Sequence, residues 1–193
     1  MEKYNPDIHH RRSIRLKDYD YSQQGLYFIT ICVQDRLLLF GNISDGKMQL
    51  NNAGKMIKKW WHELKNKFHN IELNEFVVMP NHIHGIIQIV NQNVGTDLRV
   101  CPDNTNTVQS HDAGQSHRIP PTNSLFTMVQ WFKTMTTNEY IRDVKQNGWQ
   151  PFNRKLWQRN YWEHIIRDEE SYYKIAEYIL NNPLKWQDDK YYA

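Results

Sequence analysis

Two histidines, His82 and His84, have the spacing in this chain that best suits metal chemistry. They lie in the segment Met79-Pro80-Asn81-His82-Ile83-His84-Gly85, between two apolar runs rich in β-branched residues. Because side chains alternate along a strand, both imidazoles would share one face while Ile83 points into the core. Two imidazoles placed in this way can bind one divalent cation. Spacing alone also permits the alternative of one exposed and one hydrogen-bonded histidine without a metal.

A tyrosine beside such a pair could attack phosphorus, because a phenolate is a competent nucleophile and leaving group. A bound metal would polarise the phosphate under attack. Tyr178 lies at the edge of the apolar stripe of an expected helix, and Asn182 follows one turn later on the same face. Asn182 could therefore offer an oxygen ligand to the same metal. Spacing alone favours a tyrosine at the core boundary instead, since the chain has eleven tyrosines.

Basic residues gather in two places, although the formal net charge is only +3. The first cluster, near the N-terminus, consists of Arg11, Arg12, Arg15 and Lys17. The second, which lies among Trp157, Tyr161 and Trp162, consists of Arg154, Lys155, Arg159 and Arg167. Basic residues interleaved with aromatic ones suit phosphate contacts and base stacking in nucleic-acid binding. A solvated surface is the competing interpretation of each cluster.

The overall composition indicates one domain, residues 1–193, with a substantial core, since 39% of its residues are hydrophobic. Cys32 and Cys101 are far apart and form no CxxC pair, which argues against structural zinc and suits a reducing compartment. No apolar run approaches the length of a membrane span, and the N-terminus lacks a signal-peptide pattern. We therefore expect a cytoplasmic protein without a membrane partner, associated with the nucleoid when bound to DNA.

The apolar periodicity predicts the following elements. They are a strand at 26–33, a hairpin made by 37–40 and 48–50, a helix at 53–68 capped by Asn51 or Asn52, two strands within 71–90 broken at Pro80-Asn81, a helix from Thr122, Asn123 or Ser124 to about 146, a strand at 156–166, and a helix at 168–183 capped by Asp168. Residues 1–24 are expected to form a basic arm, 91–121 a flexible insertion, and 184–193 a weakly packed tail.

Apart from the hairpin and the last helix, this order is β-α-β-β-α-β, the split ferredoxin-like plan. The predicted fold class is therefore α+β. It consists of an antiparallel ferredoxin-like sheet with helices on one face and a C-terminal helix that carries Tyr178. The other face of such a sheet can stay open and serve as a platform for nucleic acid.

The segment from Met79 to Gly85 resembles the His-hydrophobic-His ("HUH") motif of single-tyrosine transposases, in particular the REP-associated tyrosine transposases. Three further segments match that group in the same order. They are Arg11-Arg12-Ser13-Ile14-Arg15-Leu16 with Tyr19-Asp20-Tyr21, Trp157-Gln158-Arg159-Asn160-Tyr161-Trp162-Glu163-His164, and Tyr178-Ile179-Leu180-Asn181-Asn182-Pro183. The resemblance spans residues 11–90 and 122–184, whereas 91–121 exceeds the compact family pattern.

The resemblance implies an enzyme that cuts single-stranded DNA beside a hairpin formed by an imperfect palindrome and joins its tyrosine to the 5′ phosphate. Carried over, Tyr178 is the nucleophile, and His82 and His84 bind Mg²⁺ or Mn²⁺. Asn182 matches the position of a further polar metal ligand, where related transposases use Gln. No general base can be assigned. Glu163 and His164 are candidates for support of the tyrosine, with a structural role as the alternative for each.

The expected partner is single-stranded or hairpin DNA. The candidate DNA contacts are Arg11, Arg12, Arg15 and Lys17, with Arg159 and Arg167 as secondary candidates. Two other functions stay open at this point: a catalytically inactive nucleic-acid-binding module, and a metal-dependent hydrolase that activates water. We expect a monomer, with a homodimer that exchanges the tyrosine helix as the alternative.

Overall fold

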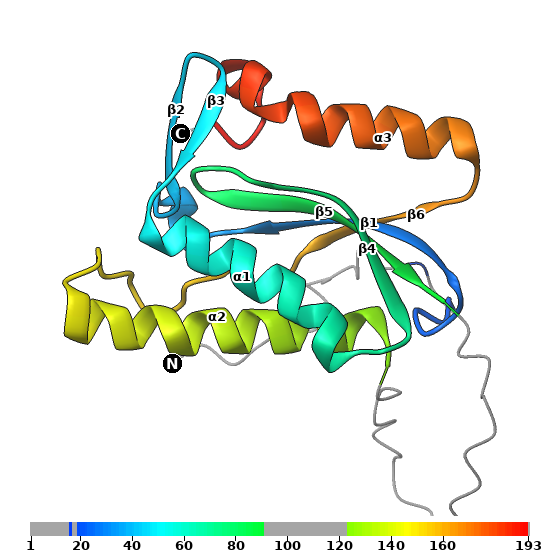
Figure 1. Cartoon of the computed structure of the whole chain (residues 1–193), viewed down its shortest axis with the longest axis horizontal. Coiled ribbons are helices and arrows are strands. Elements are labelled where there is room, and N and C mark those ends of the chain that lie inside the picture. The colour runs from blue at the N-terminus through cyan, green and yellow to red at the C-terminus, as the bar shows by residue number, and fades with distance from the viewer. Residues whose placement is uncertain (1–15, 17–18, 91–122, 193) are drawn as a thin grey trace, which may run out of the picture.

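The computed structural model of the chain describes residues 16, 19–90 and 123–192, and it contains one main sheet (Figure 1). Its strands are β1 (Gly25–Cys32), β4 (Ile71–Val78), β5 (His82–Ile89) and β6 (Trp162–Ile166), arranged in the order β4-β5-β1-β6 with every neighbouring pair antiparallel. The helices are α1 (Asn52–Lys67), α2 (Leu125–Asn147) and α3 (Glu169–Asn181). Two smaller strands form a hairpin, β2 (Gly41–Ser44) and β3 (Lys47–Leu50), and two short 3₁₀ segments are η1 (Gln34–Arg36) and η2 (Asn182–Asp188).

This arrangement confirms the predicted ferredoxin-like fold. The crossover helices α1 and α2 pack on one face of the sheet, and α3 lies on the other (Figure 1). Among the described residues, no helix combines the length and the apolar character needed to cross a membrane.

The alternation of side chains along β1 separates the two faces of the sheet. Tyr27, Ile29 and Ile31 point into the large core formed with α1 and α2. Phe28 points the other way, into a small apolar cluster that it shares with Ile86, Ile166 and Ile179 of α3. The second face, which the sequence analysis allowed to stay open, is therefore covered in part by α3.

Side-chain caps explain where the three helices begin. The Asn51 side chain accepts a hydrogen bond from the Gly54 N–H at 2.9 Å, Ser124 accepts one from Thr127 at 3.3 Å, and Asp168 accepts one from Ser171 at 2.7 Å. Helix α2 ends at Gly148, whose left-handed φ of 65° suits glycine. The predicted helix boundaries are thus confirmed to within about two residues.

Two predicted strands were placed wrongly. The hairpin begins at Gly41 rather than at residue 37, because Leu39 and Phe40 are buried in the large core instead of pairing. Strand β6 begins at Trp162 rather than at residue 156, and the preceding Leu156 is likewise a core residue.

Several predictions fall outside the described residues. They are most of the arm 1–24, of which only residues 16 and 19–24 are described, and the whole of the insertion 91–121. The DNA-contact candidates Arg11, Arg12, Arg15 and Lys17 also lie outside the described residues.

Candidate functional site

The β4–β5 hairpin presents both histidines to the α3 face of the sheet. His82 and His84 are fully buried, and Ile83 between them lies in the large core, as the alternation predicted. The next residue, Gly85, has no room for a side chain, because a Cβ there would lie 2.5 Å from the Trp61 ring, which packs against this strand. The glycine thus allows α1 to approach the strand that carries the histidines.

Hydrogen bonds on the far side of the His82 ring fix the orientation and the tautomer of this side chain. The Asn81 amide nitrogen donates to the Tyr191 carbonyl at 2.8 Å and to the Arg36 carbonyl at 3.3 Å. Its amide oxygen therefore faces His82 Nδ1, 2.8 Å away, and it can only accept. His82 Nδ1 must carry the proton, which leaves the lone pair on Nε2.

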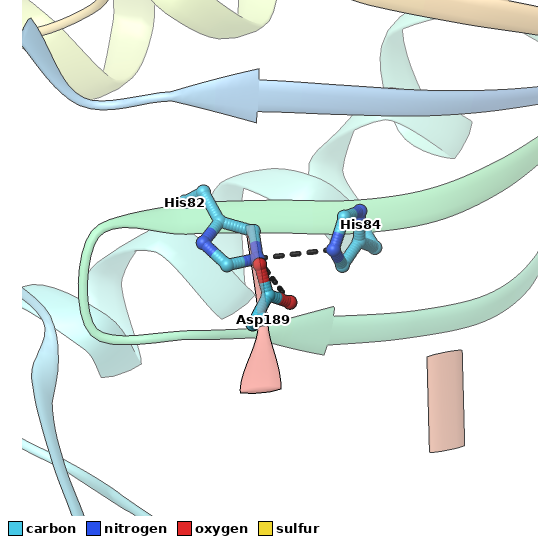
Figure 2. A group of neighbouring side chains, drawn as sticks. All are labelled: His82, His84 and Asp189. Carbon is cyan, nitrogen blue, oxygen red and sulfur yellow. Dashed lines mark hydrogen bonds and ion pairs between the residues drawn. The ribbon is translucent and has the colours of Figure 1, made fainter. Parts of the chain in front are cut away.

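His84 is held from the neighbouring strand, since its Nδ1 lies 2.8 Å from the Thr30 hydroxyl. The Nε2 atoms of His82 and His84 lie 3.0 Å apart. A carboxylate completes the cluster, because Asp189 Oδ2 is 4.0 Å from His82 Nε2 and the three ligand atoms lie within 4.8 Å of one another (Figure 2).

This donor set fits a divalent cation. Two metal bonds of roughly 2.1 Å at a right angle separate their ligand atoms by about 3.0 Å, which is the separation of the two imidazole nitrogens. Burial lowers the pKa of His82 to about 4, with the nearby Asp189 carboxylate acting in the opposite direction. Burial also lowers the pKa of His84 well below its ordinary value. Both imidazoles are therefore neutral at pH 7, the form that binds metal.

Asp189 is the candidate ligand that the sequence did not reveal. It lies just after η2, in the tail that was predicted to pack weakly, and that prediction is wrong because Trp186 is buried and the Tyr191 ring lies 4.7 Å from that of His82. The buried Asn182 donates its amide N–H to Asp189 Oδ2 at 3.0 Å. Asn182 thus contacts the site through Asp189, while its buried amide oxygen has no hydrogen-bond partner within the described structure.

Helix α3 brings Tyr178 to the same cluster, with its hydroxyl 3.2 Å from His84 Nε2. Burial raises the pKa of Tyr178 to about 12, the Asp189 charge adds to this increase, and Asn182 opposes it. The residue as a whole is still 41% exposed, so an incoming group can approach it. A tyrosine hydroxyl, two neutral imidazoles and a carboxylate together suit chemistry at a phosphate.

The two candidates for support of the tyrosine are placed differently. Glu163 pairs in register with Ile29, whose side chain enters the large core, so Glu163 lies on the sheet face opposite Tyr178. This placement removes Glu163 as a candidate for support of the tyrosine and leaves the structural role that was its alternative. His164 is on the Tyr178 face, where its ring stacks on Trp162.

Arg159 and Arg167 are exposed, one before β6 and one directly after it. Arg159 lines a surface groove with Lys133 and Lys155, and Arg167 lines another with Tyr172 and Tyr173. Neither groove includes the histidines.

Comparison with known proteins gives two relatives from Haemophilus influenzae. An uncharacterized protein is 43% identical over 198 aligned positions, covering 99% of this chain and 98% of the relative. A putative REP-associated tyrosine transposase is 25% identical over 166 positions, covering 86% of this chain and 74% of the relative. No family model matches.

A solved structure of a REP-associated tyrosine transposase bound to a REP hairpin has the same fold. Its TM-score is 0.57 at 18% identity, and the match covers 92% of this chain and 77% of that one. The transposase relative, this fold and the ordered motifs agree with one another. The chain is therefore related in sequence and similar in fold to the REP-associated tyrosine transposases, the group that its ordered motifs resemble.

Proposed function

We propose that the chain is a metal-dependent enzyme that nicks single-stranded DNA beside hairpins and transfers the strand through a 5′-phosphotyrosine intermediate. The observation that carries this proposal is the 3.2 Å contact between the Tyr178 hydroxyl and His84 Nε2, at the cluster formed with His82 and Asp189. The hairpin DNA bound to the solved transposase of the same fold supports the choice of substrate.

In this proposal, His82, His84 and Asp189 would hold Mg²⁺ or Mn²⁺. The cation would neutralise charge on the phosphate and favour the ionised form of a nearby hydroxyl. Asn182 would orient the Asp189 carboxylate through its 3.0 Å hydrogen bond, while direct ligation by its amide oxygen is the alternative expected from the family resemblance.

The raised pKa of Tyr178 keeps its phenol protonated at neutral pH, so the proposed reaction begins with transfer of this proton to a solvent water molecule. The phenolate oxygen then attacks phosphorus, and the bond from phosphorus to the 3′ oxygen breaks. The leaving oxygen keeps the bonding electron pair and takes up a proton to become a 3′ hydroxyl. The new phosphotyrosine ester conserves a phosphodiester bond, so a different 3′ hydroxyl can reverse the step and complete strand transfer.

The rest of the chain would serve this chemistry as one domain, residues 1–193, with 168–183 as the tyrosine helix. The proposed phosphate contacts are Arg11, Arg12, Arg15, Lys17, Arg159 and Arg167. Because one chain supplies Tyr178 and both histidines, we propose that a monomer is the active form.

The test is to incubate the protein with end-labelled hairpin DNA and Mn²⁺ and to look for a protein–DNA adduct that survives denaturation. We expect an adduct with the natural chain, none with Tyr178→Phe, and normal amounts with Tyr173→Phe, an exposed tyrosine of the same helix. His82→Ala should abolish the adduct and leave most DNA binding intact. An adduct that persists in Tyr178→Phe would disprove the assignment of the nucleophile. Cleavage without an adduct would favour a hydrolase, and binding without cleavage would favour an inactive module.

A further inference from the structure

The outer strand of the sheet exposes two aromatic rings next to the tyrosine site. Strand β6 is at the edge of the main sheet, since among the described strands it pairs only with β1. Trp162 and His164 pair in register with Thr30 and Phe28, so they point to the same face as His84 and Tyr178. Trp162 is 42% exposed, and His164 is exposed as well.

The rings are held in a defined arrangement. The planes of Trp162 and His164 are 5° from parallel, with centroids 6.0 Å apart. The buried Phe28 ring joins them to the site, because its centroid lies 5.6 Å from that of Trp162, 5.5 Å from that of His84 and 6.1 Å from that of Tyr178. Trp162 and the tyrosine thus contact the same supporting ring, and His164 stacks on Trp162.

One basic side chain lies beside this aromatic pair, and two more flank β6 in the sequence. The Lys190 ammonium lies 5.4 Å from the Trp162 ring centroid. Arg159 precedes β6 and Arg167 follows it, and both are exposed. Exposed aromatic rings flanked by basic side chains are the arrangement with which proteins hold single-stranded nucleic acid, by stacking on bases and contacting phosphates.

We propose that Trp162 and His164 form a base-stacking platform for single-stranded DNA. Its location also implies that the base held there belongs to a nucleotide close to the phosphate that Tyr178 attacks, and this second part rests on the proposed function. Every base has a π-face, so the platform should tolerate different sequences and set the path of the strand.

The experiment compares binding of oligothymidylate with binding of an abasic oligonucleotide of the same length, in EDTA so that no cleavage occurs. The two probes carry the same phosphates and differ in their bases. The natural chain should prefer oligothymidylate. Trp162→Ala should bind oligothymidylate roughly five- to hundredfold more weakly, with little change for the abasic probe. Trp162→Phe, which keeps a ring, should retain most of the preference.

Leu180→Ala is the control, because Leu180 of α3 is 66% exposed and lines neither of the grooves that contain Arg159 and Arg167. It should behave like the natural chain, and thermal unfolding should show that Trp162→Ala is folded. An equal loss of affinity for both probes in Trp162→Ala, or no preference in the natural chain, would overturn the proposal. So would an unchanged preference in Trp162→Ala. Because binding in EDTA requires neither Tyr178 nor a metal, this result is independent of the adduct assay.

Discussion

At the scale of single residues, Asp189 supplies the negative charge of the cluster that it forms with His82 and His84. We predict that Asp189→Asn lowers the affinity for Mn²⁺ at least about tenfold, since hard divalent cations favour charged oxygen ligands. Isothermal titration calorimetry would measure this change. Asp188→Asn is the control, because it removes the same charge from the preceding exposed residue. Equal losses of Mn²⁺ affinity in the two variants would mean that Asp189 acts only through its negative charge and is not a metal ligand.

Asn182 is predicted to act on the metal through Asp189, to which it donates a 3.0 Å hydrogen bond. Asn182→Ala should then weaken Mn²⁺ binding roughly tenfold in the natural chain, as loss of a supporting hydrogen bond does, and much less in an Asp189→Asn background. A calorimetric double-mutant cycle would measure the coupling. Additive losses would instead favour Asn182 as an independent ligand.

The sequence alone could predict part of this site, namely the two histidines, but not the carboxylate. His82 and His84 are readable because they are two residues apart on a strand, so that local geometry alone brings them together. Asp189 carries no such signal, since it follows them by more than a hundred residues in a polar tail. Its position depends on the burial of Trp186 and on the hydrogen bond from Asn182, which are tertiary contacts.

At the scale of elements, α3 is attached to the sheet by a small apolar cluster in which Ile179 is fully buried. Ile179→Ala should lower the free energy of local opening of α3 by about 2–4 kcal/mol, because it leaves a cavity under the helix. Hydrogen exchange of α3 amides would measure this, and adduct formation should fall with it. The neighbouring Leu180 is 66% exposed, so Leu180→Ala should change stability by less than about 0.5 kcal/mol. Equal effects of the two substitutions would contradict this account of how α3 docks.

Helices and strands could be predicted where the apolar residues of the sequence pattern are buried by the element itself. Helix α1 has a cap at Asn51 and an apolar stripe, and both are realised. The predicted strand at 37–40 does not form, because Phe40 belongs to a buried connection that contacts distant parts of the chain. The Phe40 N–H donates to the Pro80 carbonyl at 3.0 Å, and its side chain packs on Trp157. Such a buried connection has the same apolar signature as a strand.

At the scale of the whole molecule, the sheet lies between the large hydrophobic core and the candidate active site. The large core lies with α1 and α2, whereas the metal-ligand candidates and Tyr178 lie on the opposite face under α3 and the C-terminal segment. Buried polar groups on that face nevertheless affect folding, because burial favours the neutral form of His82 and of His84.

This burial predicts that the metal-free protein loses stability in mild acid. The pKa of His82 falls from 6.5 to about 4 on folding, so between these values the unfolded chain binds a proton that the folded chain does not. The free energy of unfolding should therefore decrease as the pH falls from 6.5 towards 4, by about 3 kcal/mol for His82 alone, and His84 should act in the same direction. Above pH 6.5 both states hold neutral imidazoles, and this dependence should disappear.

Urea unfolding in EDTA at several values between pH 5 and 8 would measure the effect, and most of this range lies above the titration of ordinary carboxyl groups. A variant with His82→Gln and His84→Gln keeps polar side chains at both positions but cannot titrate there, so its stability should depend much less on pH below 6.5. A slope as steep as that of the natural chain would show that other groups cause the acid sensitivity. A flat profile in the natural chain would mean that the two histidines accept protons in the folded state as readily as in the unfolded chain, and this would contradict the lowering of their pKa by burial.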